Sequence, residues 1–113
     1  MSVSTDVSGN LNKFYDQVRT DFPKLLEGSS VDSAVIFNNT THPITFFVYN
    51  YIDTVYWISA QHTLVAPGKI GRVAASGKFY KIHPNDNKDH EFLVQPKQAY
   101  VYSGPGDVEE VKH

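Results

Sequence analysis

The chain has 113 residues, no cysteine and a formal net charge of -2. A single domain of this length buries enough surface to fold by packing alone. The missing cysteines exclude disulfides and thiolate metal sites. A slightly acidic chain is not expected to bind nucleic acid, because that binding needs a basic excess to displace counterions from phosphates.

The first thirteen residues, MSVSTDVSGNLNK, lack the basic and apolar regions of a secretory signal. The chain also has no run of about 18 apolar residues that could span a bilayer. We therefore expect a cytoplasmic protein without a transmembrane segment. Peripheral association with a membrane stays open.

The N-terminal segment is predicted to form an amphipathic helix near residues 9–21, followed by a kinked turn around Asp21 with Pro23 in its first turn. Ser8 or Asn10 can cap its start. Its apolar side chains recur every three or four positions: Leu11, Phe14, Tyr15, Val18, Phe22 and Leu25.

We expect residues 1–30 to pack on a second unit, residues 31–113. Docking of the helix to another copy, a partner or a membrane is the alternative.

After Ser30 the hydrophobic period changes to two, and short runs rich in Val, Ile, Tyr, Phe and Thr alternate with turn clusters. The runs are AVIF, ITFFVYN, TVYWIS, TLVA, IGRVAA, FYKI, EFLVQ, AYVY and a weak DVEEV. Their spacing leaves no room for crossover helices, which favours antiparallel pairing. The sequence therefore predicts a mainly β fold, an antiparallel β-sandwich of seven or eight strands or a small barrel.

The stretch ITFFVYNYIDTVYWI, residues 44–58, holds six aromatic residues and one charge. Strand alternation gives it one face for the core and a second, more polar face. The core face carries Ile44, Phe46 and Val48, and the second face carries Thr45, Phe47, Tyr49 and Tyr51. The second face is expected to be covered by the helix, a second chain or a ligand.

Tyrosine and tryptophan side chains can stack on sugars, sit at the headgroup level of a bilayer, or anchor a protein partner. The alternative is that these aromatic residues are simply core and helix-facing residues. The predicted ligand-binding residues are Tyr49, Tyr51, Tyr56, Trp57, Tyr100 and Tyr102.

Four basic residues also arrive within thirteen positions with no acid among them, which suggests a weak anion-binding site. They are Lys69, Arg72, Lys78 and Lys81. The alternative is that they mark the solvated face of one hairpin.

No nucleophile motif and no recognised metal spacing is present, so we predict no catalytic residues, no metal and no cofactor. The leading hypothesis is a non-enzymatic binding module whose aromatic sheet face contacts a membrane surface, a glycan or a protein partner. The alternative is a self-assembling protein whose aromatic face and helix are buried in a homo-oligomer.

Overall fold

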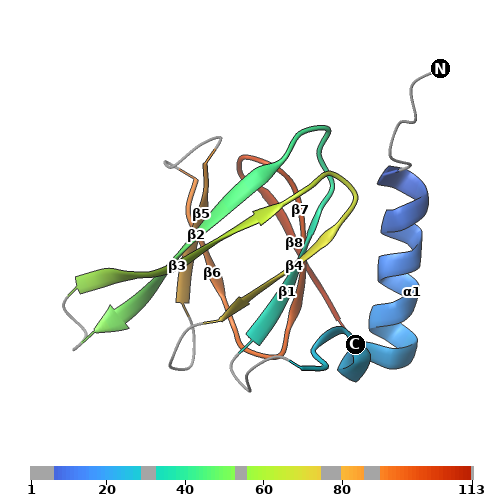
Figure 1. Cartoon of the computed structure of the whole chain (residues 1–113), viewed down its shortest axis with the longest axis horizontal. Coiled ribbons are helices and arrows are strands. Elements are labelled where there is room, and N and C mark those ends of the chain that lie inside the picture. Colours follow the sequence, from blue (N-terminus) through green and yellow to red (C-terminus); the bar gives the residue numbers. More distant parts are fainter. Residues whose placement is uncertain (1–6, 29–32, 53–55, 75–79, 86–89, 113) are drawn as a thin grey trace.

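A computed structural model describes residues 7–28, 33–52, 56–74, 80–85 and 90–112, with the backbone alone for 50–52, 56–61, 74 and 80. Within these residues the chain forms one helix followed by eight strands (Figure 1). The elements are α1 (Val7–Leu25), β1 (Ser33–Asn38), β2 (Ile44–Ile52), β3 (Tyr56–Val65), β4 (Ile70–Ala74), β5 (Tyr80–Pro84), β6 (Phe92–Val94), β7 (Ala99–Gly104) and β8 (Asp107–Val111). The predicted mainly β fold is confirmed.

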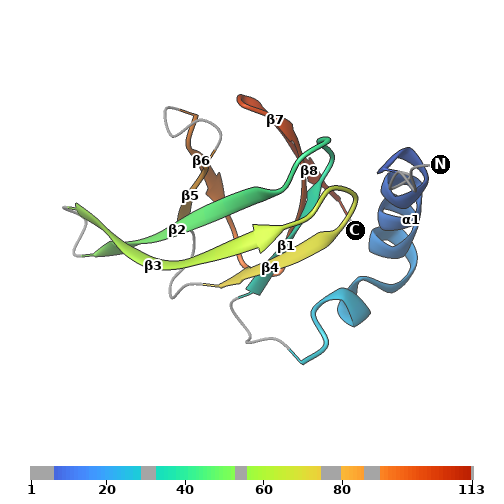
Figure 2. The same cartoon turned by 45° about the horizontal axis from the view of Figure 1, so that its top comes forward.

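The strands form two open sheets of four, in the orders β4-β1-β7-β8 and β3-β2-β5-β6. The two sheets face each other as the layers of a sandwich, and neither closes into a barrel (Figure 2). Neighbouring strands pair antiparallel except β1 and β7, which run parallel.

The main core fills the space between the sheets, where alternate residues of the strands meet. Ile44, Phe46 and Val48 are all buried there, which confirms the predicted core face of β2. The complete cluster is Ala34, Ile36, Ile44, Phe46, Val48, Val65, Val73, Ile82, Val94, Tyr100 and Tyr102.

Helix α1 packs on the outer face of the sheet β4-β1-β7-β8 and makes a second core there (Figure 1). Asp21 has non-helical angles (φ -154°, ψ 55°), so the predicted kink before Pro23 is observed. Phe14 stacks on Phe37 of β1 with ring centroids 5.3 Å apart. The buried members of this cluster are Phe14, Val18, Phe22, Leu25, Val35, Phe37, Ala99, Val101 and Val111.

Polar bonds hold the two ends of α1 to the sheet. The Asn10 Nδ2 atom donates to the carbonyl of Gly68 (3.0 Å), and the Arg72 Nε atom donates to the carbonyl of Leu25 (2.8 Å). Ser8 and Asn10 both lie within α1, so the prediction that one of them caps the helix start is wrong.

Two sequence expectations about strand organisation also fail. The runs TVYWIS and TLVA were expected to be separate strands, but they contribute to one ten-residue strand, β3. Gln61 and His62, which lie between the runs, pair with β2 and so continue the strand. Strands β4 and β5 do not form a hairpin, because β4 pairs with β1 and β5 pairs with β2.

Candidate functional site

The outer face of the sheet β3-β2-β5-β6 is the side of the sandwich that α1 does not cover (Figure 2). The helix was one of three expected covers for the second face of residues 44–58. It packs instead on the opposite sheet, because its apolar stripe matches the outward residues of β1 and β7. Covering by the helix is therefore excluded.

A row of rings crosses this outer face from β3 to β5. Phe47 on β2 lies between His62 on β3, at a centroid distance of 5.9 Å, and His83 on β5, at 5.1 Å. Tyr49 lies 5.4 Å from the same His83 ring. The planes of Phe47 and Tyr49 lie within 23° and 26° of the His83 plane. Because neighbouring rings face one another, their edges point toward solvent.

The bonds of His83 fix how these rings stand. Its Nδ1 atom lies 3.2 Å from the carbonyl oxygen of Pro84, and its Nε2 atom lies 3.1 Å from the Tyr49 hydroxyl. A carbonyl only accepts, so Nδ1 carries the hydrogen, and in the neutral ring Nε2 accepts from the tyrosine. Tyr49 is therefore held by a specific bond to β5.

Charge on this face is balanced at its β5–β6 side. The Lys81 ammonium lies 5.7 Å from the centroid of the Tyr49 ring and forms a 2.9 Å ion pair with Glu91. Two leucines border the rings: Leu64 on β3 is 68% exposed and Leu93 on β6 is 58% exposed. The described part of the face thus combines apolar side chains, imidazoles and the Lys81 ammonium, which is paired with Glu91.

The β2–β3 hairpin continues this face beyond the body of the sandwich (Figure 1). Among the described residues, β2 pairs with β5 only as far as Tyr49↔Lys81. Beyond that pair, β2 and β3 continue together as a two-stranded ribbon that ends at Ile52↔Tyr56.

A β-bulge in β3 determines which face of the sheet each later position of that strand in the ribbon falls on. Val48 pairs with Gln61 while the next residue, Tyr49, pairs with Ser59, so Ala60 is the extra residue of β3. Directly paired residues share a face of the sheet. Because one residue is skipped, the register position of Trp57, opposite Tyr51, falls on the outer face with Tyr49. Without the bulge, position 57 would fall on the inner face.

The predicted ligand-binding residues separate into two groups. Tyr49 lies on the outer face, and the backbone positions of Tyr51 and Trp57 continue it, whereas Tyr56 pairs with Ile52 on the other side of the ribbon. The side chains of Tyr51, Tyr56 and Trp57 lie outside the described residues.

Tyr100 and Tyr102 do not belong to the outer face. They are 5% and 0% exposed and lie between the sheets, where Tyr102 meets Phe46 edge to face at 5.2 Å. Strand β7 is a central strand, so both of its faces are covered. These two predicted ligand-binding residues therefore do not belong to the outer face.

The predicted basic residues do not form one patch. Lys69 precedes β4, Arg72 lies on β4 and binds the end of α1, and Lys81 lies on β5 of the other sheet. Lys78 lies outside the described residues. The anion-site expectation fails for the described members, because consecutive strands here enter different sheets.

Sequence reasoning missed Phe47, His62 and His83 as members of one row. Alternation alone placed Phe47 on the second face, but it gave no relation between that face and either histidine. The pairing of β2 with both β3 and β5 brings them together. Within the described ranges, no group of three or more His, Asp and Glu side chains is placed to hold a metal ion.

The chain matches no protein-family model, no curated protein and no solved structure. In the part of the chain that the structure describes, no helix has the length and apolar character that a membrane span requires.

Proposed function

We propose that this protein is a non-enzymatic binding module that contacts a protein partner through the outer face of the sheet β3-β2-β5-β6 and the β2–β3 ribbon. The observation that carries the proposal is the bulge at Ala60, which places the position of Trp57 on the same face as Phe47, Tyr49 and Tyr51. A bulge that re-aims positions is typical of functional surfaces.

The ring geometry supports a protein rather than a glycan. A sugar stacks on the flat face of an aromatic ring. Phe47 and Tyr49 turn their faces toward His83, with centroid distances of 5.1 and 5.4 Å, so those faces are occupied within the row. Ring edges, an imidazole and nearby leucines suit the apolar centre of a protein interface.

The charges support a protein rather than an anionic membrane. Attraction to anionic headgroups depends on clustered, unpaired basic residues. On this face Lys81 is paired with Glu91, and Arg72 is on the opposite sheet at the end of α1. The described part of the face therefore offers no basic cluster to a bilayer.

The test compares immobilised wild type with the variant Phe47→Asp in affinity capture from an extract of the source cells. Burying a carboxylate in an interface is costly, so at least about tenfold less of a specific partner is expected on the variant. Asn12→Asp is the matched control, because Asn12 is exposed on α1 and gains the same charge on the opposite side. The captured protein is then titrated in purified form, and the same loss of affinity is expected.

Vesicles of zwitterionic and anionic lipid and a glycan panel are titrated in parallel, with Trp57 emission as the readout. A change with either of these and no discriminating protein contradicts a protein partner. Equal capture by wild type and Phe47→Asp contradicts the outer face as the binding surface.

A second candidate function is self-association through the edge of β3. This edge strand has ten residues and no charged residue, whereas the edge strand β6 has three residues and the edge strand β8 carries three carboxylates. Long uncharged edges tend to pair with another strand. The apolar stripe of α1 packs within its own chain, so assembly would rest on the sheet alone.

Solution mass distinguishes this candidate. A dimer that Ser59→Lys converts to monomer supports it, because a lysine on an edge opposes strand pairing. A monomer at the highest soluble concentration contradicts it.

A further inference from the structure

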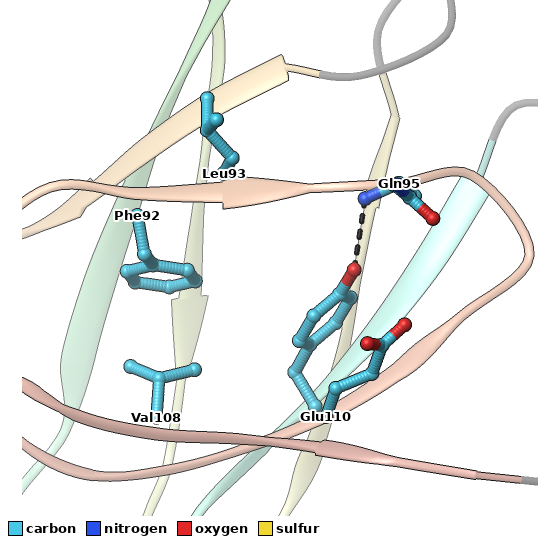
Figure 3. Close-up of a pocket in the computed structure, with 6 residues that line it drawn as sticks. Phe92, Leu93, Gln95, Val108 and Glu110 are labelled. Atoms are coloured by element: carbon cyan, nitrogen blue, oxygen red, sulfur yellow. Dashed lines mark hydrogen bonds between the residues drawn. The ribbon is translucent and has the colours of Figure 1, made fainter.

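The side of the sandwich between β6 and β8 is open and forms a groove of about 360 Å³ (Figure 3). It lies between the two sheets, where it is bounded by two edge strands, and Leu93 is the lining residue that it shares with the outer face. Its lining residues are Phe92, Leu93, Gln95, Tyr100, Val108 and Glu110. Its volume is at the low end of the range for small-molecule sites.

The groove has an apolar floor. Phe92 of β6 and Val108 of β8 pack against the main core from opposite sheets and stay partly accessible. Behind them, the ring of Phe92 lies 6.4 Å from that of the fully buried Tyr102. Because β6 has only three residues, it does not extend far enough to close the two edges over this floor.

A polar wall stands beside the floor. The Tyr100 hydroxyl accepts a 2.9 Å hydrogen bond from the Gln95 backbone N–H and so bridges the two sheets (Figure 3). Glu110 is the cross-strand partner of Tyr100 on β8. Among the described residues, neither the hydrogen of the Tyr100 hydroxyl nor the Glu110 carboxylate has a bonding partner.

The surroundings of this wall are negative. Burial, and to a lesser extent the nearby Glu110 carboxylate, raise the pKa of Tyr100, although the Gln95 bond opposes them. The tyrosine therefore keeps its hydrogen as a donor at neutral pH. Among the described lining residues Glu110 carries the charge, whereas Glu109 alternates with it on β8 and bonds to Tyr15 on the other face of that strand. The groove thus favours a cation over an anion.

We propose that this groove binds a small organic amine. The apolar part of the amine packs against Phe92 and Val108, and its ammonium group pairs with the Glu110 carboxylate. If the amine also carries a hydrogen-bond acceptor, that atom accepts from the Tyr100 hydroxyl. Charge complementarity selects the ammonium, and the volume limits the ligand to a small molecule. The groove shares Leu93 with the outer face, but its polar groups at Tyr100 and Glu110 do not belong to that face, and the proposal does not rest on the function proposed for it.

The probe is 2-phenylethylamine, titrated into the folded full chain at neutral pH and low salt. Amide chemical shifts of Gln95, Val108 and Glu110 are followed by two-dimensional NMR. We expect saturable shifts at these amides, at least about fivefold weaker binding of the neutral analogue 2-phenylethanol, and no saturation with 3-phenylpropanoate.

Glu110→Gln is expected to weaken binding of the amine at least about fivefold, and the shifts should diminish as salt screens the charge. Asp107→Asn is the matched control, because it removes the same charge from β8 without lining the groove. Equal binding of amine and carboxylate, or equal loss in both variants, would overturn the proposal. Shifts confined to the outer face would overturn it as well. None of these three results tests whether the outer face binds a protein partner.

Discussion

The Tyr15 hydroxyl of α1 donates a 2.5 Å hydrogen bond to Oε1 of Glu109 on the edge strand β8. This bond joins residues 94 positions apart in sequence and ties the middle of the helix to the sheet. With the bonds at Asn10 and Arg72, it holds α1 along its length on one side of the sandwich. The helix therefore does not cover the opposite sheet.

The Tyr15–Glu109 bond predicts a loss of stability at high pH. The bond to the carboxylate is the main reason that the pKa of Tyr15 rises from its ordinary 10.0 to about 12. A pKa raised in the folded state means stabilisation that is complete below pH 10 and lost as the pH rises through 12. We expect Tyr15→Phe to lower the free energy of unfolding by about 0.5–1 kcal/mol at pH 8, since the pair is exposed.

Urea unfolding of both proteins at several pH values checks this. The difference between wild type and Tyr15→Phe should shrink toward zero by about pH 12. Glu109→Gln is the companion variant, and it should bring the tyrosinate titration of Tyr15 back toward 10. A difference that does not change between pH 8 and 12 contradicts the bond as its source.

Phe14 and Phe47 are expected to differ sharply in their effect on stability. Phe14 is 1% exposed and stacks on Phe37 under the helix, whereas Phe47 is half-buried on the outer face. Phe14→Ala should lower the free energy of unfolding by about 3–5 kcal/mol, because it leaves a cavity. Phe47→Ala should cost about 1 kcal/mol. Urea denaturation measures both, and equal costs would mean that the outer face is covered in the native protein.

Strand alternation was sufficient to identify the core face of β2, and helical spacing identified the stripe of α1. Both patterns are local, and each follows from one element and its backbone period. The burial of Tyr100 and Tyr102 is not local. It depends on β7 lying between β1 and β8 with the helix on one face and the other sheet on the opposite face. Without the strand order, a run such as AYVY cannot be distinguished from an exposed aromatic strand.

The candidate site depends on strand order in the same way. His83 joins the row only because β5 pairs with β2 rather than with β4, its predecessor in the chain. The bulge gave no signal in the sequence, since Ala60 is an ordinary strand residue. The face of the sheet on which position 57 falls therefore could not be derived without the register between β2 and β3.

Close packing of β4 on β3 predicts a steric effect at Gly71. A Cβ atom there would lie 2.3 Å from Cγ2 of Val65, closer than atoms can approach. Gly71→Ala should therefore lower the free energy of unfolding by about 1–3 kcal/mol.

A double-mutant cycle separates this clash from other effects of the alanine. Val65→Ala alone should cost about 2 kcal/mol, because it empties space in the core. In that background Gly71→Ala should cost at least about 1 kcal/mol less than in wild type. Additive costs from urea unfolding would show that Gly71 is required for a reason other than its contact with Val65.

Two different changes would remove the Ala60 bulge, and they are expected to have opposite effects on which face the ribbon residues occupy. Deleting Ala60 leaves Gln61 and Ser59 adjacent, opposite Val48 and Tyr49, and so keeps every pair of the ribbon in its phase. Inserting one alanine after Val48 also restores a regular ladder, because the new residue pairs with Ala60. The insertion, however, moves every later position of the ribbon to the opposite face.

The deletion is therefore expected to fold with the Tyr49–His83 contact intact, and the insertion to fold without it. Cross-strand proton NOEs between residues 51 and 57 should persist in both variants, since both retain that pair. NOEs between the Tyr49 and His83 rings, which lie 5.4 Å apart, should persist only in the deletion. Binding to a partner of the outer face should follow the ring NOEs. A deletion variant that loses the Tyr49–His83 contact while keeping the 51–57 pair would contradict the assigned role of the bulge.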